Sequence, residues 1–139
     1  FAERIARVTA RAMGEVLVDA AGRLGRLSAE KPSTRRSLLE RVERVRGRLH
    51  DAPEAAFRLE QLAALAGMSQ FHLARTFRAV HGEPIVAYHR RLKLERAARL
   101  LAADAASPTQ LTETLGFSDP AAFSRAFKRR YGVAPGVYR

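Results

Sequence analysis

The sequence contains two copies of one pattern, and this internal repeat constrains the fold more than any other feature. A leucine, a glycine and a serine recur in the same order 49 residues later. After the turn the offset becomes 50 residues, so the second copy has one additional residue there. Repetition of this kind predicts two structural units of the same type. The matched pairs are Leu62/Leu111, Gly67/Gly116, Ser69/Ser118, Leu73/Phe123, Arg75/Arg125, Phe77/Phe127, Gly82/Gly132 and Tyr88/Tyr138.

Apolar residues recur at spacings of three and four throughout the chain, whereas the alternation typical of β-strands is absent. This pattern predicts an all-α fold, because residues three and four positions apart share one face of a helix. Glycines follow several apolar stretches, where a residue without Cβ can end a helix in a left-handed conformation. Residues 25–34 have the composition of a linker. Helices are expected at about residues 4–24, 35–50, 59–66, 70–80, 84–103, 108–115 and 120–131.

Two of these helices begin with clear capping signals. Ser107 and Gln110 have the spacing of a capping box, with Pro108 at the first helical position. Asp119 also precedes a proline, which repeats the order of cap and proline. Arg58 is a poor cap for the helix expected to begin next to it. Each copy of the repeat is therefore predicted to be a short helix, a glycine-containing turn and a longer helix.

This order of elements is that of a helix-turn-helix unit, whose second helix enters the DNA major groove. The spacing alone also fits a generic pair of helical hairpins. The formal net charge of +11, from 25 basic and 14 acidic residues, favours a polyanionic partner. Nearly all the basic residues are arginine, which suits phosphate oxygens and guanine edges but also follows from a GC-rich genome. Charge by itself does not separate DNA from RNA or an anionic membrane.

Composition also excludes several kinds of site. The chain has no cysteine, which excludes disulfides, thiolate zinc sites and cysteine nucleophiles. No apolar run approaches the roughly 20 residues needed to span a bilayer, so a cytoplasmic location is expected. The four histidines lack metal-ligand spacing, and the acidic residues form no pair suited to acid-base catalysis. We therefore expect no catalytic residue, no cofactor and no metal.

Residues beyond the repeat spacing point to one family. In the second copy they are the stretches 116–119, 123–128, 131–135 and 138–139, which read GFSD, FSRAFK, YGVAP and YR. In the first copy they are Leu62, Ala63, Gly67, Met68, Ser69, Leu73, Phe77, Gly82, Tyr88, Arg96 and Ala97. Over roughly residues 59–139 this combination resembles the AraC family of bacterial transcription regulators. Two positions depart from the pattern: Arg58 stands where a serine or threonine cap is common, and Thr112 where a small alanine is usual, which puts close packing there in question.

The resemblance implies a DNA-binding domain over residues 53–139, with helix-turn-helix units at about 59–80 and 108–131. Residues 1–52 are expected to form a helical linker or interaction segment, or the end of a sensor domain that lies upstream. The bridging helix expected at 84–103 would be roughly 30 Å long at 1.5 Å per residue. One turn of B-DNA is about 34 Å, so a single chain can reach two consecutive major grooves.

The resemblance assigns the base-reading positions to the second helix of each unit. In the first unit they are Gln70, Phe71, Ala74 and Arg75, and in the second Pro120, Ala121, Ser124 and Arg125. The second set has only two side chains able to read polar base edges, so we expect it to discriminate less between sequences. Internal packing of Phe71 is the alternative at that position. The expected phosphate contacts are Arg78, Arg90, Arg91, Lys128 and Arg129, and the alternative for each is an ordinary solvated surface charge.

The expected partners are double-stranded promoter DNA, RNA polymerase and a second copy of the chain, bound through the N-terminal or an upstream region. No membrane partner is expected. The alternative for the whole chain is a helical protein-interaction module with nonspecific affinity for nucleic acid.

Overall fold

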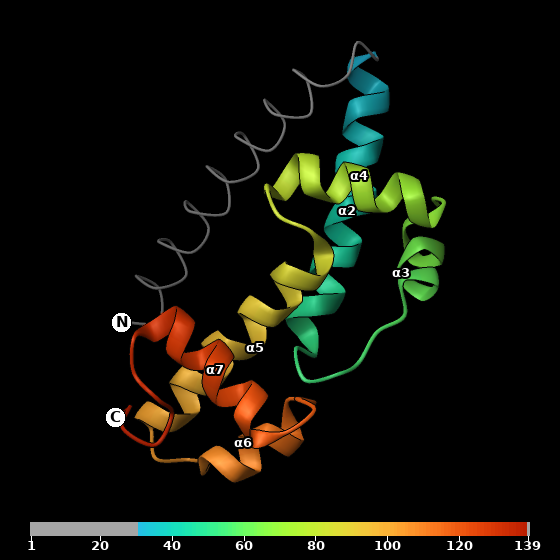
Figure 1. Cartoon of the computed structure of the whole chain (residues 1–139). Helices are drawn as coiled ribbons and strands as arrows, with labels where there is room; N and C mark the ends of the chain where they lie inside the picture. The colour runs from blue at the N-terminus through green and yellow to red at the C-terminus, as the bar shows by residue number, and fades with distance from the viewer. Residues whose placement is uncertain (1–30, 139) are drawn as a thin grey trace. The chain divides into compact units, whose positions relative to one another are not determined.

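The computed structural model describes residues 31–138, and all regular secondary structure in that range is α-helical. The helices, shown in Figure 1, are α2 (Pro32–Asp51), α3 (Leu59–Ala66), α4 (Gln70–His81), α5 (Ile85–Ala102), α6 (Pro108–Thr114) and α7 (Pro120–Tyr131). For the described part of the chain, the prediction of an all-α fold is confirmed. The helix expected at 4–24 and the linker residues 25–30 lie outside the described residues.

The start of α2 differs from the sequence prediction. Residues 32–34 were expected in the linker, but the helix already begins at Pro32. Proline is tolerated in the first helical turn because its missing N–H has no partner to lose there. The carbonyl of Lys31 accepts the N–H of Arg35 at 3.1 Å, which closes that turn. The linker prediction was therefore wrong from Pro32 onward.

The chain forms two compact units. Among the described residues, unit one takes 31–45 and 59–85, and unit two takes 46–58 and 86–138. Helix α2 thus contributes residues to both units, and α5 begins at the last residue of unit one. The boundary expected near residue 52 does not coincide with this division.

Unit one contains the two helices and the turn of the first copy of the repeat. Leu73, Phe77 and Val80 of α4 are fully or almost fully buried. Helices α2 and α3 and the first residue of α5, Ile85, supply the other buried apolar side chains. From α2 these are Leu38, Val42 and Val45, and from α3 Leu62, Ala63 and Ala66.

Polar contacts within unit one join α2 to the two helices of the repeat. Nη1 of Arg41 donates to the carbonyl of Gly67 at 3.2 Å. Nε2 of His81 lies 3.4 Å from Oε1 of Glu43. These contacts hold the first part of α2 against the turn after α3 and the end of α4.

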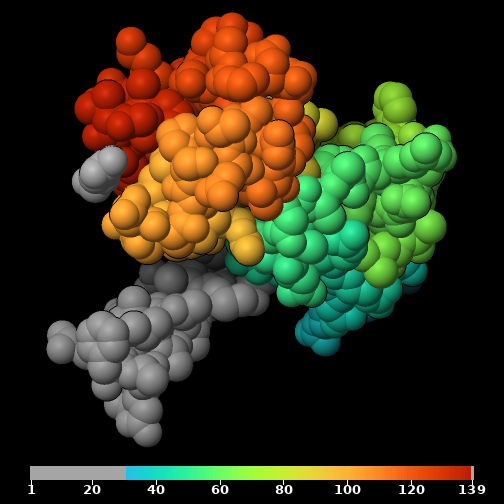
Figure 2. Space-filling view, turned by 90° about the horizontal axis from the view of Figure 1, so that it is seen from below, coloured from blue at the N-terminus to red at the C-terminus, as the bar shows by residue number. Residues whose placement is uncertain are grey.

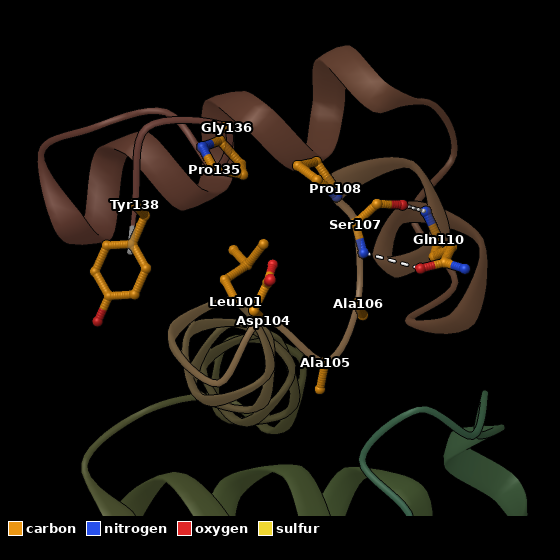
Figure 3. Close-up of a pocket in the computed structure, with 10 residues that line it drawn as sticks. All are labelled: Leu101, Asp104, Ala105, Ala106, Ser107, Pro108, Gln110, Pro135, Gly136 and Tyr138. Carbon is orange, nitrogen blue, oxygen red and sulfur yellow. Dashed lines mark hydrogen bonds between the residues drawn. The ribbon is translucent and has the colours of Figure 1, made fainter.

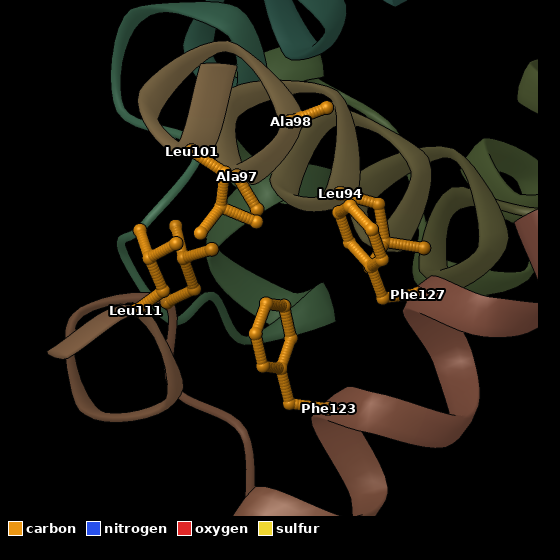
Figure 4. Close-up of a cluster of buried hydrophobic side chains, with 8 residues drawn as sticks. Leu94, Ala97, Ala98, Leu101, Leu111, Phe123 and Phe127 are labelled. Atoms are coloured by element: carbon orange, nitrogen blue, oxygen red, sulfur yellow. The ribbon is translucent and has the colours of Figure 1, made fainter. Parts of the chain in front are cut away.

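Unit two contains the second copy of the repeat. Figure 2 shows α6, α7 and the C-terminal segment as one continuous surface, coloured orange to red. In Figure 4, Phe123 and Phe127 project from α7 toward the side chains of α5. Tyr138 then packs on Phe127, with ring centroids 5.2 Å apart, so the chain after α7 closes over the same core. The buried cluster consists of Leu94, Ala97, Ala98, Leu101, Leu111, Leu115, Phe123 and Phe127.

Helix α6 begins as the sequence predicts. The backbone N–H of Ser107 donates to Oε1 of Gln110 at 2.9 Å, and the N–H of Gln110 donates to Oγ of Ser107 at 3.2 Å (Figure 3). This reciprocal pair is the predicted capping box. Thr112 is buried in the same helix, and its hydroxyl donates to the carbonyl of Pro108 at 3.0 Å. The hydroxyl is thereby satisfied, so this departure from the family pattern does not prevent close packing.

The two turns of the repeat have the same backbone hydrogen bonds. The N–H of Met68 donates to the carbonyl of Ala63 at 3.0 Å, and that of Phe117 to the carbonyl of Thr112 at 3.1 Å. This bond belongs to the motif that ends a helix with a left-handed residue. Gly67 and Gly116 supply that residue, with φ of 64° and 70°. The predicted helix-ending role of these glycines is confirmed.

The additional residue of the second turn changes which side chain caps the following helix. Oγ of Ser69 accepts the N–H of His72 at 3.1 Å at the start of α4. At the start of α7, Oδ1 of Asp119 accepts the N–H of Ala122 at 2.7 Å. Ser118, the sequence counterpart of Ser69, therefore lies in the turn and is not the cap.

Two contacts in unit two attach the segment around the end of α2 to α5. His89 is buried, its Nε2 lies 2.7 Å from the carbonyl oxygen of Pro53, and its ring stands edge-on to that of Phe57. The hydroxyl of Tyr88 lies 2.6 Å from Nε2 of His50. Burial lowers the pKa of His89 below its ordinary 6.5, more strongly than the bond to Pro53 raises it. The neutral imidazole donates its Nε2–H to the carbonyl.

We predict that a chain beginning at Asp51 is much less stable than one beginning at Lys31. The shorter chain lacks Leu38, Val42, Val45 and Leu49, which are at most 7% exposed. Burial of each such side chain contributes roughly 1.5–3 kcal/mol, and a whole domain is stable by only about 5–15 kcal/mol. Thermal unfolding followed by circular dichroism compares the two chains. Equal midpoints would place the limit of the folded region near residue 53, as the sequence suggests.

We also predict that His89 makes stability depend on pH. The pKa of His89 is lower in the folded than in the unfolded chain, so on acidification the unfolded chain binds a proton first. Stability from the neutral ring is complete above pH 6.5 and is lost as the pH falls through 6.5 toward the folded-state pKa. Denaturant unfolding from about pH 7.5 to about pH 5 should show a smaller loss in His89→Gln than in the wild type. His72→Gln is the control and should keep the wild-type slope; equal slopes in all three chains would contradict the assignment.

Candidate DNA interface

The first candidate reading face lies on α4, opposite its buried side. Burial of Leu73, Phe77 and Val80 fixes the rotation of this helix about its axis. Thr76 is buried beside them, and at 3.6 residues per turn the opposite side of the helix points away from the core. Phe71 is 82% exposed, so internal packing of this side chain, the alternative left open by the sequence, does not occur. The exposed residues of this face are Gln70, Phe71, Ala74, Arg75 and Arg78.

The second candidate face lies on α7, again on the side of the helix opposite its own buried residues. Phe123 and Phe127 are buried at the positions that match Leu73 and Phe77. The residues left on the other side are Pro120, Ala121, Arg125, Lys128 and Arg129, all exposed, and Ser124, which is partly buried. The expected reading residues of the second unit are thus brought together on one helix, as in the first.

The two faces differ in chemistry. The first combines an amide, a large aromatic ring and two guanidinium groups near one another along α4. The second has a proline and two alanines in its first turn, followed by a hydroxyl and a guanidinium group. Hydrogen-bonding groups that can read base edges are therefore more numerous on α4 than at the start of α7.

Arg91 differs from the other basic residues expected at the interface. It is partly buried, and its Nη1 donates to Oε1 of Glu95 at 3.1 Å. Its guanidinium carbon also lies 4.8 Å from the ring centroid of Tyr88. The same Glu95 oxygen accepts from Nη2 of Arg130 at 3.3 Å. Arg91 is therefore engaged within unit two, whereas Arg90 is exposed.

Unit two also gathers basic residues from two helices around one hollow. Arg90 of α5 and Arg125 and Arg129 of α7 line it, together with Lys93 of α5. Lys93 was not among the residues expected from the sequence to contact a ligand. The only signal for it is its place three residues after Arg90, on the same face of a helix.

Other kinds of site find no support in the part of the chain that the structure describes. Over residues 31–138, histidine and acidic side chains nowhere gather in groups of three that could hold a metal ion. No helix within the same range is both long enough and apolar enough to cross a membrane.

Comparison with known proteins gives the family. The model of the helix-turn-helix domain family matches residues 62–139. The RCS-specific HTH-type transcriptional activator RclR of Escherichia coli K12 is 29% identical over 116 residues, which are 84% of this chain and 41% of RclR. The chain thus spans less than half the length of this relative.

Solved structures agree with this match. The DNA-binding domain of AdpA, a global transcriptional factor crystallised with a target DNA, is 28% identical, with a TM-score of 0.65 over 70% of this chain and 87% of that one. A Chromobacterium violaceum transcriptional regulator with an AraC-type DNA-binding domain has the same fold, at 24% identity and a TM-score of 0.64 over 69% of this chain and 86% of that one. The chain belongs to the AraC family of helix-turn-helix transcription regulators.

Proposed function

We propose that this chain binds double-stranded DNA sequence-specifically, as the DNA-binding part of a transcription regulator. Helices α4 and α7 are its recognition helices. The observation that carries the proposal is the matched exposure of Arg75 and Arg125 on two helices whose opposite faces are buried at matched positions. A relative's DNA-binding domain of similar fold, crystallised with its target DNA, supports the same partner. The residues named here serve binding, and none is assigned to catalysis.

The length of α5 suits two consecutive major grooves. The helix has 18 residues and is therefore about 27 Å long at 1.5 Å per residue. Allowing for the residues at either end, this approaches the roughly 34 Å between successive turns of one groove. We infer that one chain contacts a pair of adjacent grooves on one side of the duplex.

The two recognition helices contribute unequally to discrimination between DNA sequences. The guanidinium of Arg75 fits O6 and N7 of a guanine, whereas Phe71 and Ala74 offer apolar contact to a thymine methyl group. Helix α7 has only Ser124 and Arg125 for polar base edges and adds exposed cations farther along. We therefore assign most of the sequence discrimination to α4. Phosphate contacts, which position a protein without reading sequence, are assigned to Arg78, Arg90, Lys128 and Arg129.

The remaining partners follow from the proposed role. Promoter binding by a regulator implies an effect on RNA polymerase and a location where the chromosome lies, in the cytoplasm. A homodimer formed through residues 1–52 or an upstream region would place two such readers on one operator. Selection of binding sites from random DNA, followed by mobility shifts on a selected and a scrambled duplex, tests the proposal. Equal affinity for the two duplexes would leave only nonspecific binding.

We predict that substitutions of base-reading and of phosphate-contacting residues change the affinity for the two duplexes in different ways. Arg75→Ala removes a bidentate contact worth roughly 1–3 kcal/mol of discrimination and should weaken binding mainly to the selected duplex. Arg125→Ala should have a smaller effect of the same kind. Lys128→Ala should weaken binding to both duplexes alike and reduce the slope of log affinity against log salt by about 0.9.

Titrations of each variant at several salt concentrations measure these differences. Arg36→Ala is the matched control, because Arg36 is an exposed arginine on α2 and lies on neither recognition helix. If Arg75→Ala lost the same affinity on both duplexes, Arg75 would be a backbone contact and the assignment of the α4 face would be wrong.

A further inference from the structure

The basic hollow of unit two is a built concave site rather than a row of surface charges. Its volume is about 310 Å³, and its walls come from α5, from the turn before α7 and from α7 itself. Four of its lining side chains are cationic: Arg90, Lys93, Arg125 and Arg129. Ser118, which the additional residue of the second turn frees from the capping position, adds a hydroxyl group.

No carboxylate compensates these charges. The residues that line the hollow include no aspartate or glutamate. Within residues 31–138, none of the four cations forms an ion pair. Glu95, two residues beyond Lys93 on α5, is instead held by Arg91 and Arg130 at 3.1 and 3.3 Å. The hollow therefore concentrates positive charge that an anion would neutralise.

Lys93 is held at this hollow by its packing. It is the one cation of the four that is partly buried, and its Nζ lies 4.8 Å from the ring centroid of Phe117. Phe117 in turn packs on Phe123 of the core, with ring centroids 5.1 Å apart. Burial and the nearby charge of Arg90 lower the pKa of Lys93 below its ordinary 10.5. The negative charge of a bound anion would raise this pKa.

The shape and the donors favour a phosphate group over other anions. Guanidinium groups present paired N–H donors that match phosphate oxygens, and an ammonium group contributes a compact point charge. Ala122 and Ala126 of α7 and Gly116 of the turn, small residues all, line the remaining wall. An added Cβ at Gly116 would meet nothing within 4 Å, so the space there is open.

We propose that this hollow is a phosphate-binding site of the chain, with Lys93 as its inner cation and Arg90 and Arg129 as its outer ligands, while Arg125 lines it and keeps its role in base reading. Two sources can supply the phosphate group. One is a phosphodiester of the DNA backbone beside α7, in which case the inference rests on the proposed function. The other is a free phosphate compound, in which case the site stands independently of DNA binding.

Lys93→Met is the central variant, because methionine keeps an unbranched side chain over Phe117 and removes the charge. Two variants are controls. Lys93→Arg keeps the positive charge at this position, and Lys31→Met removes the charge of an exposed lysine outside the hollow. Circular dichroism shows whether Lys93→Met is folded. Arg129→Gln removes an exposed cation of the same hollow and tests the site if Lys93→Met does not fold. Each chain is titrated with the selected and the scrambled duplex at several salt concentrations and, separately, with pyrophosphate by calorimetry.

If the DNA backbone is the source, Lys93→Met should lose about tenfold in affinity on both duplexes, with the salt slope reduced by about 0.9. Lys93→Arg and Lys31→Met should stay near wild type. If a free phosphate compound is the source, wild type should bind pyrophosphate, and Lys93→Met should abolish that binding with duplex affinity retained. Arg129→Gln should abolish pyrophosphate binding as well. Unchanged affinity for duplex and pyrophosphate in both variants would overturn the site. A wild-type chain that does not distinguish the duplexes would contradict the proposed function alone, since pyrophosphate titration still decides the site.

Discussion

Burial of one phenylalanine in each recognition helix is the constraint on which the candidate interface depends. Phe77 and Phe127 are fully buried at matched positions, and each fixes the rotation of its helix about the helix axis. A helix turns by about 100° per residue, so this rotation decides which side chains face outward. Arg75 and Arg125 each stand two positions before the buried ring and are thereby directed away from the core. The outward faces follow from the packing of the inward ones.

The same scaffold supports two different surfaces. Its repeated parts are those that set geometry: the apolar anchors, the left-handed glycines and the hydrogen bonds at helix ends. The core also differs at matched positions, with Leu73 in one copy and Phe123 in the other. The differences that concern binding face outward. The additional residue in the second turn belongs to this class, because it gives capping of α7 to Asp119 and leaves Ser118 at the basic hollow.

Sequence predicted the local features well because they depend on near neighbours. Gly67 was expected to end its helix, and its positive φ has the physical cause inferred for it. The start of α2 was predicted wrongly, because a proline in a polar stretch is typical both of a linker and of a first helical turn, as at Pro32. The sequence did not predict the partners of individual side chains. Arg91 pairs with Glu95 on the same helix, one of several pairings open to it, and Lys93 lines a hollow with residues of α7 only because α5 and α7 pack together. The candidate reading residues of each unit lie on one face of one helix, α4 or α7. Their contacts with bases remain a prediction.

In the function proposed for this chain, α4 and α7 enter two consecutive major grooves of one duplex. Methylation interference on a selected duplex tests this most directly, because methylation of guanine N7 blocks contacts in the major groove. We expect two clusters of interfering guanines about one helical turn, roughly 10–10.5 base pairs, apart. Arg75→Ala should weaken the interference of one cluster and leave the other. A single cluster, unchanged by Arg75→Ala, would contradict the claim.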